Sequence, residues 1–243
     1  MSFIKNNKMR SSVREYTCDK KLSKEEKSKF IEILQNVPTS NNFFMSSSII
    51  IEDKQTLKKL SEITNQYQIK DCSMFVLFLA DFNRLNYILD LRNHENYDKG
   101  LNSLLVGTGD SFIAATMIQD AATEMGLGTC FIGGVRGHIE EISQLLKIEG
   151  VALPIIGITI GYPLKKSQIL KPKQKTTFFE KYDYKLLVEN ANEYNDNLKN
   201  FYNKLGIPND YFTSAYNSLC RNTEEPDQVI KKCWNLEKNS KEK

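Results

Sequence analysis

The segment from Ser111 to Met125 has the composition of a helix that is apolar on nearly every side. Its apolar residues are Phe112, Ile113, Ala114, Ala115, Met117, Ile118, Ala121 and Ala122, and Gly126 and Gly128 follow as helix-ending residues. A helix without a polar face has to be buried. It therefore lies either in the middle of the core or in a surface shared with a second copy of the chain. The small alanines allow close approach of another backbone, which favours a homodimer.

Further strands and helices are expected on both sides of this helix. The capping box Ser23-Lys24-Glu25-Glu26 opens a helix that ends before Pro38. Met74 to Ala80 is a continuous apolar run, which predicts a strand covered on both faces. The pattern also predicts strands at Ser47–Glu52, Thr129–Ile132 and Val151–Ile160, and helices at Gln55–Ile63, Ile139–Ile148 and Tyr184–Leu205. We expect a single domain over 1–243, with a core at about 10–180, a helical C-terminal extension at about 181–234 and a frayed tail at 235–243.

Charge and cysteine content exclude several classes of function. The 243 residues carry 33 basic and 30 acidic side chains, a difference too small to direct the chain to nucleic acid or to a membrane surface. The five cysteines are odd in number and have no C-x-x-C spacing, which indicates reduced thiols in a cytoplasm. Neither histidine lies at a zinc-ligand spacing from a cysteine, so no metal is expected. No secretory signal is expected, and the longest apolar stretch, Val151–Leu164, is too short to span a bilayer.

Two basic segments far apart in the sequence have the composition of a phosphate site. The first is Arg10-Ser11-Ser12-Val13-Arg14, and the second is Lys171-Pro172-Lys173. Guanidinium, ammonium and hydroxyl groups are the donors that a phosphate requires. The alternative is that these are solvated surface charges, which is the more common role of a lone lysine.

Three polar or glycine-containing segments lie between the basic ones: Thr39-Ser40-Asn41-Asn42, the pair Gln66 and Gln68, and Cys130-Phe131-Ile132-Gly133-Gly134-Val135-Arg136. Each also has an ordinary interpretation. The first is a turn after a helix, the glutamines are surface residues, and the glycines form a turn. Two other motifs are set aside: Gly107–Ser111 lacks the Gly-Lys-Ser/Thr ending of a phosphate loop, and Cys130 is interpreted as a core residue rather than a nucleophile.

Taken in order, these motifs resemble the nitroreductase superfamily, specifically its oxygen-insensitive NAD(P)H nitroreductase and flavin reductase branch, which carries FMN. The family's opening motif usually reads His-Arg-Ser-hydrophobic-Arg, so Ser12 and Arg14 fall in register, while Arg10 stands in place of the His and Ser11 in place of an Arg. The family's Ile-Gly-Gly-hydrophobic-Arg signature matches Ile132 to Arg136. The resemblance covers about Arg10 to Phe179.

The resemblance implies the role of each candidate residue. The residues implied to contact FMN are Arg10, Ser11, Ser12, Arg14, Thr39, Ser40, Asn41, Gln66, Gln68, Ile132, Gly133, Gly134, Lys171 and Lys173. Asn42 and Arg136 are implied to contact the substrate. Catalytic side chains and metal ligands are not implied, because the flavin carries the chemistry.

The fold implied is the family's α+β sandwich, a mixed and mainly antiparallel sheet flanked by helices in an intertwined homodimer. The activity implied is a ping-pong transfer of hydride from NAD(P)H through FMN to a nitroaromatic, a quinone or free flavin. Two alternatives stay open: a flavin-binding protein for storage or sensing, and a cofactor-free interaction domain. In this branch arginines of the C-terminal third meet the NADPH 2′-phosphate. Here Arg221 stands alone and Glu224-Glu225-Pro226 replaces a common Arg-Pro, so we expect a preference for NADH.

Overall fold

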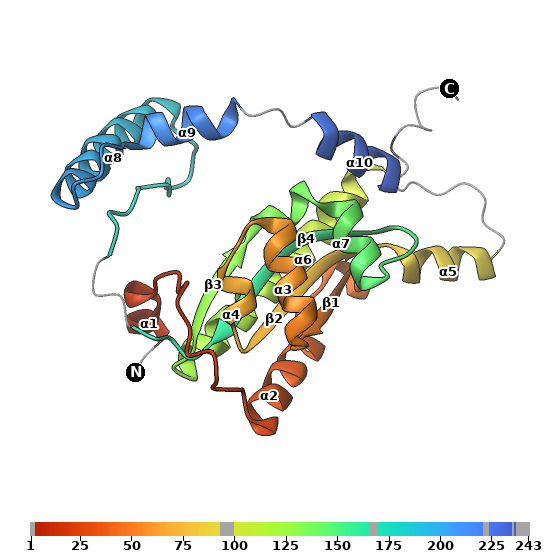
Figure 1. The fold of residues 1–243 in the computed structure, drawn as a ribbon. Helices are drawn as coiled ribbons and strands as arrows, with labels where there is room; N and C mark the ends of the chain where they lie inside the picture. The colour runs from red at the N-terminus through yellow and green to blue at the C-terminus, as the bar shows by residue number, and fades with distance from the viewer. Residues whose placement is uncertain (1–2, 93–99, 166–169, 221–223, 235, 237–243) are drawn as a thin grey trace. The chain divides into compact units, whose positions relative to one another are not determined.

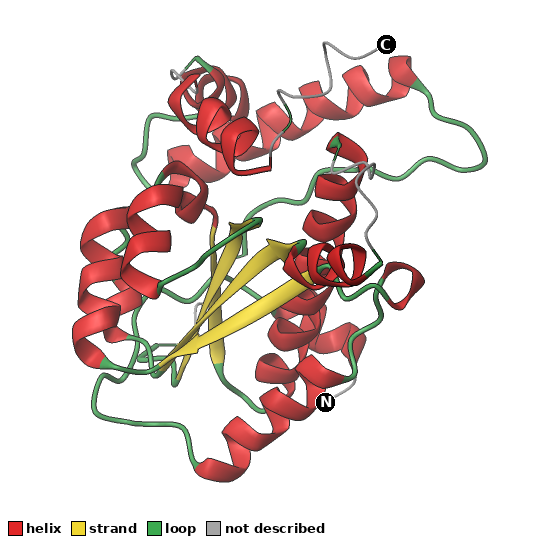
Figure 2. Cartoon of the chain, turned by 90° about the vertical axis from the view of Figure 1, so that its right-hand side faces the viewer, coloured by secondary structure: helices red, strands yellow, loops and turns green. Residues whose placement is uncertain are grey.

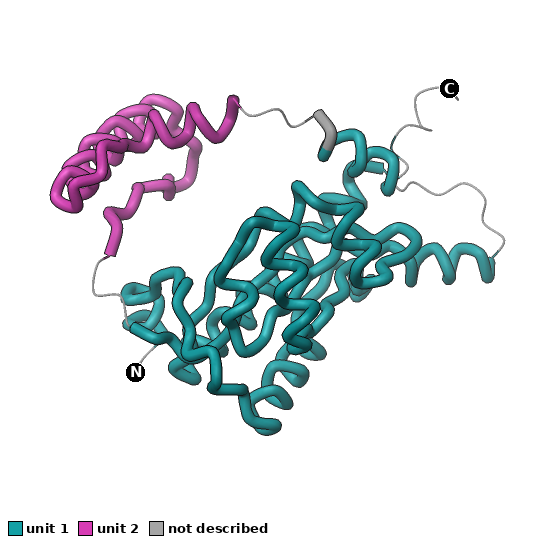
Figure 3. Tube along the Cα trace, in the orientation of Figure 1, with its two compact units in different colours: residues 1–166, 224–243 teal, residues 167–223 magenta. Residues whose placement is uncertain are grey.

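The computed structural model describes residues 3–92, 100–165, 170–220, 224–234 and 236, without the side chains of Glu224 and Glu225. The chain divides into two compact units, Met1–Lys166 with Glu224–Lys243, and Ser167–Thr223 (Figure 3). The single domain expected over 1–243 stays a prediction. The frayed tail expected from Asn235 lies, apart from Leu236, outside the described residues.

The first unit is built on an antiparallel sheet of four strands. These are β1 (Ser46–Ile51), β2 (Met74–Asp81), β3 (Gly128–Ile132) and β4 (Ala152–Gly161), in the spatial order β1-β2-β4-β3 (Figure 1). All three strand pairs are antiparallel, with Met74 opposite Ile160 and Cys130 opposite Thr159. The expected α+β class is confirmed.

The position of β2 between two hydrophobic cores explains why its sequence contains a continuous apolar run. Met74, Val76 and Phe78 belong to one hydrophobic core, whereas Phe75 and Leu77 belong to a second core on the other side of the sheet. All five side chains are fully buried. Because successive side chains of a strand point to opposite faces, a strand between two cores needs an apolar residue at every position.

Helices cover both faces of the sheet (Figure 2). On the first face lie α2 (Lys24–Gln35) and α6 (Leu101–Glu124), with α5 (Asn83–Leu91) packed against the same core. On the other face lie α3 (Lys54–Thr64), α4 (Gln68–Asp71) and α7 (Ile139–Leu146). The short α1 (Phe3–Met9) packs on α6. Two 3₁₀ turns lie in the connections: η1 (Ser40–Asn42) between α2 and β1, and η2 (Gly133–Gly137) between β3 and α7.

The capping box predicted for α2 is present. The Ser23 hydroxyl accepts a hydrogen bond from the Glu26 backbone N–H at 3.1 Å, and the Glu26 carboxylate accepts one from the Ser23 backbone N–H at 2.7 Å. Both bonds satisfy donors that the first turn of a helix otherwise leaves free. Phe30, on the inner face of this helix, is fully buried.

The apolar helix is longer than predicted, because α6 begins at Leu101 instead of Ser111. Ala115 and Ile118 face the core and are fully buried. Phe112 and Ile113, on the outer side, are each 42% exposed. A single chain thus buries only one side of α6, and the surface shared with a second copy stays a prediction for the other side.

The C-terminal helix α10 (Glu224–Trp234) belongs to the first unit. Trp234 is fully buried, its indole N–H donates to the Ser103 hydroxyl at 3.0 Å, and its ring meets the Phe82 ring edge-on with centroids 6.0 Å apart. An indole needs an acceptor for its N–H when it is buried, and Ser103 supplies that acceptor.

The second unit contains α8 (Tyr184–Lys204) and α9 (Tyr211–Leu219). Asp183 and Asp210 cap these helices through bonds from the backbone N–H groups of Leu186 and Thr213, at 2.9 and 2.7 Å. The helix predicted at Tyr184–Leu205 is confirmed.

Candidate functional site

The N-terminal motif lies against β3. The Val13 backbone N–H donates to the Thr129 carbonyl at 2.8 Å. A Cβ on Gly128 would lie 2.8 Å from the Val13 side chain, so this glycine allows the two backbones to approach. The contact fixes the position of the flanking residues Ser12 and Arg14.

Tyr16 anchors the end of the same segment. Its hydroxyl donates to the Val13 carbonyl at 2.9 Å and lies 2.7 Å from the Thr159 hydroxyl on β4. Burial raises the pKa of Tyr16 far above its usual range, so the phenol is neutral and serves as a structural hydrogen-bonding group. Residues 13–16 are therefore positioned by the sheet itself.

Several predicted flavin residues meet around Cys130 of β3. Burial raises the pKa of the Cys130 thiol, while the positive charge of Arg14, interactions with the Ser12 and Gln68 side chains, and the charge of Arg10 act in the opposite direction. The interpretation of Cys130 as a core residue is supported, because its side chain is buried. The electrostatic surroundings of this thiol thus include groups from two distant parts of the sequence, the N-terminal motif and Gln68.

Gln66 and Gln68 form a pair beside this cluster. The Gln68 amide donates to the Gln66 side-chain carbonyl at 2.8 Å, and Gln68 is only 2% exposed. The ordinary interpretation as surface glutamines is therefore wrong for Gln68. Gln68 opens α4, and the next residue, Ile69, is also fully buried, which no pattern in the sequence indicates.

Arg10 and Arg14 differ in their electrostatic surroundings. Arg10 lines a hollow of 310 Å³ together with Asp120 and Glu124. Burial raises the pKa of the Asp120 carboxyl, and the charge of Arg10 partly opposes that rise. Arg14 is exposed, and in the described part of the chain it forms no ion pair with a carboxylate. Arg14 is thus the guanidinium whose charge is the more available to an anion.

The Gly133-Gly134 turn follows β3 directly and opens η2. A Cβ on Gly134 would meet nothing closer than 3.7 Å, and one on Gly133 would lie 3.2 Å from the Arg136 guanidinium. Neither glycine has a positive φ. What the pair provides is a bare stretch of backbone next to the buried Ile132, which a flat ligand can approach closely.

Arg136 borders both this turn and an apolar hollow. Its guanidinium donates to the Ile155 carbonyl at 2.8 Å. The hollow measures 280 Å³, and its lining includes Leu104, Thr108, Phe112, Arg136, Pro154 and Ile230. Arg136 supplies the only charge among the residues of this lining, so the hollow suits a small aromatic molecule with one polar edge.

The Thr39–Asn42 turn is anchored separately, on α6. The Ser40 backbone N–H donates to one carboxylate oxygen of Asp110 at 3.2 Å, and Asp110 is 2% exposed. The other Asp110 oxygen and the Thr39 hydroxyl are buried without a partner in the described part of the chain. Asn41 and Asn42 are exposed, so their amides are available to a ligand.

Lys171 and Lys173 are exposed and lie in the second unit. The Lys171 ammonium donates to the Tyr202 hydroxyl at 3.1 Å and lies 5.3 Å from the centre of the Tyr202 ring. Among the candidates, Gln66 and Gln68 are joined by a hydrogen bond, and Arg10, Ser12, Arg14 and Gln68 all influence the pKa of Cys130. Whether the two lysines join them is part of the proposal below.

Within the described ranges no cluster of three or more His, Cys, Asp or Glu side chains has the arrangement of a metal site. Among the described helices, Leu101–Glu124 is long and apolar enough to cross a membrane by length and composition, a test that the core helix of a soluble protein also meets.

Comparison with known proteins places this arrangement in a family. The model of the nitroreductase family matches residues 8–162. The chain is 38% identical over 159 residues to the FMN reductase [NAD(P)H] of Bacillus subtilis (strain 168), a match that covers 64% of this chain and 64% of that protein, just under two thirds of its length. It is 31% identical over 197 residues to the CR(VI) reductase of Pseudomonas sp. (strain G-1), covering 79% of this chain and 80% of the relative.

A solved structure agrees over nearly the whole chain. NfrA2 of B. megaterium superposes with a TM-score of 0.88 at 28% identity, covering 96% of this chain and 98% of the other. The sheet order, the central apolar helix and the N-terminal motif along β3 are thus parts of a known architecture. The chain belongs to the nitroreductase family.

Proposed function

We propose that this protein is an FMN-dependent oxidoreductase that transfers hydride from NAD(P)H through bound FMN to nitroaromatics, quinones or free flavin by a ping-pong mechanism. The observation that carries the proposal is the cluster on β3: the bond from the Val13 backbone N–H to the Thr129 carbonyl holds Ser12 and Arg14 against the strand that contains Cys130 and leads into the bare Gly133-Gly134 turn. The similarity to an FMN reductase [NAD(P)H] supports the cofactor and the donor.

The chemistry of the cluster fits FMN. A phosphate requires positive charge and hydrogen-bond donors, and Arg14 and Ser12 supply both from a segment held by the sheet. In this proposal Arg10, Ser11, Lys171 and Lys173 complete the phosphate site. The isoalloxazine and ribityl contacts fall to Gln66, Gln68, Thr39, Ser40, Asn41, Ile132, Gly133 and Gly134. Bound FMN supplies the hydride chemistry, and the protein's part is to bind it, orient it and leave one face open.

Asn42 and Arg136 are proposed to contact the second substrate. The apolar hollow beside Arg136 supports small aromatic or quinone oxidants, because it offers an apolar wall and one cation. For the donor we propose a preference for NADH. Arg221 lies outside the described residues, and the side chains of Glu224 and Glu225 are not described, so this part of the proposal is based on sequence composition.

We further propose that the protein is a homodimer and works in the cytoplasm as one functional domain over 1–243. The exposed outer side of α6, with Phe112 and Ile113, supports the dimer, because exposed apolar surface of this kind commonly marks an interface. The five free cysteines support a reducing compartment.

The rival candidate is a storage or sensing protein that holds flavin without turnover. A visible spectrum of the purified protein, followed by titration with NADH and NADPH and then a quinone, separates the two. We expect a yellow protein that bleaches with the reduced nicotinamide and regains its colour with the quinone. A yellow protein that does not bleach contradicts the enzyme, and a protein that stays colourless with excess FMN contradicts both.

A further inference from the structure

The loop formed by η1 and the residues that connect it to β1 has an unusual backbone conformation. Asn41, Asn42 and Phe44 have φ angles of 51°, 55° and 50°. Asparagine tolerates the left-handed region, but a bulky residue such as phenylalanine enters it only when surrounding contacts hold it there. The Phe44 side chain is also 49% exposed, so burial of the ring does not account for the conformation.

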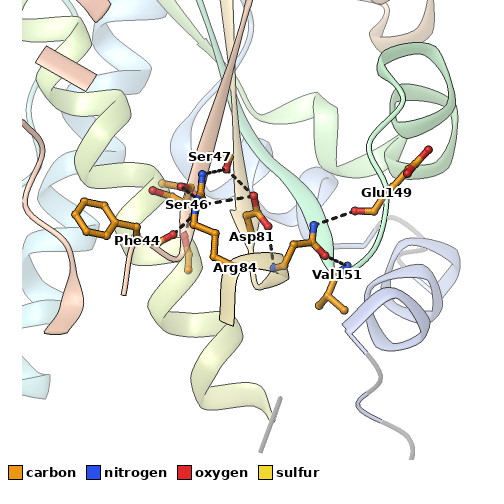
Figure 4. Close-up of polar contacts among 10 residues, drawn as sticks. Phe44, Ser46, Ser47, Asp81, Arg84, Glu149 and Val151 are labelled. Atoms are coloured by element: carbon orange, nitrogen blue, oxygen red, sulfur yellow. Dashed lines mark hydrogen bonds and ion pairs between the residues drawn. The ribbon is translucent and has the colours of Figure 1, made fainter. Parts of the chain in front are cut away.

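Arg84 makes contacts that account for it. Its guanidinium donates to the Phe44 carbonyl at 3.1 Å and the Ser46 carbonyl at 3.4 Å, and a second nitrogen donates to the Ser47 hydroxyl at 3.0 Å (Figure 4). One rigid planar group thus bonds three positions of the segment that leads into β1. Between them, the Met45 carbonyl accepts the Asp81 backbone N–H at 3.0 Å.

Asp81 in turn orients Arg84. One carboxylate oxygen of Asp81 lies 3.5 Å from the Arg84 guanidinium and accepts a bond from the Ser47 hydroxyl at 2.5 Å. The other accepts the Asn83 backbone N–H at 3.0 Å, at the start of α5, the helix that carries Arg84. Asp81 is 12% exposed and Arg84 is 52% exposed, so the carboxylate is the fixed member of the pair.

Asn83 connects the start of α5, by two side-chain hydrogen bonds, to the turn at residues 149–151 before β4. Its side chain donates to the Glu149 carbonyl at 3.0 Å and accepts the Val151 backbone N–H at 2.9 Å (Figure 4). The front of the loop is held independently, where Asp110 accepts the Ser40 backbone N–H. The loop is therefore fixed at both ends, while Asn41, Asn42 and two phenylalanine rings are presented outward.

We propose that Arg84, oriented by Asp81, is a positioning residue that holds Asn42 and Phe44 in the conformation that receives the electron acceptor. The inference rests on the proposed function, in which Asn42 contacts the acceptor. It assigns a role to residues that do not themselves touch flavin or substrate. Loss of the guanidinium releases the rear of the loop, whereas the flavin residues on β3 and the Asp110 anchor stay in place.

The test uses the FMN-loaded full chain with menadione as acceptor and NADH as donor. We expect Arg84→Ala to raise the KM for menadione about tenfold while kcat and the bound FMN per chain stay within about twofold, the pattern of lost binding that is equal in ground and transition states. Asp81→Asn is expected to show a smaller rise of the same kind. Lys58→Ala is the control, since Lys58 lies on the exposed surface of α3, where it pairs with Glu62 at 4.0 Å.

Arg84→Lys separates positioning from mere stability. Lysine keeps the charge but cannot bond three loop positions from one planar group. We therefore expect Arg84→Lys to have the melting temperature of the wild type and a KM for menadione between those of the wild type and Arg84→Ala. If Arg84→Ala does not fold, Arg84→Lys and Asp81→Asn carry the test. If the wild type is active and the variants change the melting temperature but not the KM for menadione, the inference about Arg84 is wrong and the proposed function is unaffected. A wild type that does not turn over overturns the proposed function, and this inference with it.

Discussion

The two halves of the proposed phosphate site are built differently. Arg14 follows Val13, whose backbone is bonded to β3, and precedes Tyr16, which is buried and bonded to β4. Lys171 is exposed, and its ammonium contacts Tyr202 of its own unit. The first half is thus fixed by the sheet before a ligand arrives, whereas the exposed Lys171 side chain is held by a contact with another side chain, Tyr202. Preorganised groups bind more strongly because less freedom is lost on binding.

The sharpest test of this comparison is Arg14→Ala. A bond to a charged group contributes about 1.5 to 3 kcal/mol, so we expect FMN to bind about ten- to a hundredfold more weakly. Flavin fluorescence titration of the apoprotein measures the change. Arg14→Lys, which keeps the charge without the planar fork, is expected to fall between the wild type and Arg14→Ala. Unchanged affinity in Arg14→Ala removes the sheet-held half from the site.

The double variant Lys171→Ala/Lys173→Ala tests the other half. We expect FMN to be retained at least about tenfold less well on dialysis. Each lysine is expected to contribute the energy of one charged bond, and the contact of Lys171 with Tyr202 lowers that contribution. Lys175→Ala is the matched control, because Lys175 pairs with Glu193 at 2.8 Å in the same unit. A loss in the double variant larger than that in Arg14→Ala reverses the comparison, and full retention of flavin removes the lysines from it.

The donor preference tests a third region, the C-terminal third of the chain. We expect kcat/KM with NADH to equal or exceed that with NADPH, because the acidic Glu224-Glu225 pair repels a 2′-phosphate. Steady-state kinetics with both donors and one quinone measure the ratio. A ratio strongly in favour of NADPH refutes the expectation without affecting the flavin site.

The smallest expected effect is a difference in the rate of thiol labelling between buried cysteines, among them Cys130 of the sheet, and cysteines on the surface. Cys18 and Cys220 are exposed, whereas burial raises the pKa of Cys72 to about 12 and raises that of Cys130. The thiolate is the reactive form, so N-ethylmaleimide at pH 8 is expected to label Cys18 and Cys220 first. Mass spectrometry of the native protein, with urea-denatured protein as the fully labelled control, follows the order. Early labelling of Cys130 contradicts a closed β3 cluster.

Much of the first unit was predictable because its local signals agree with its packing. The capping box of α2 and the apolar run of β2 are confirmed, since each pattern is used by the fold in the expected way. The start of α6 was missed because Gly107 and Gly109 weaken the helical pattern. The structure gives a reason for Gly107. A Cβ there would lie 2.8 Å from the Met45 carbonyl and 3.1 Å from the Ala80 Cβ, so glycine permits α6 to approach β2 and the residue before β1.

The site was predictable only in part. The resemblance predicts which residues belong together, and that grouping stays a prediction. No periodicity in the sequence shows that Gln68 is buried, or that Arg10 lies near Asp120 while Arg14 lacks a carboxylate partner in the described part of the chain. The network around Arg84 was also missed. Two of its four partners are the backbone carbonyls of Phe44 and Ser46, which carry no signature in side-chain sequence.

The chain contains a single tryptophan, and it is the one that closes α10 against Phe82 and Ser103. An indole in such dry surroundings emits at shorter wavelength than one in water. We therefore expect the protein's ultraviolet fluorescence to report on one event, the seating of the last helix. A red shift under mild denaturant that precedes loss of the far-ultraviolet dichroism would show the C-terminus leaving the body before the sheet melts.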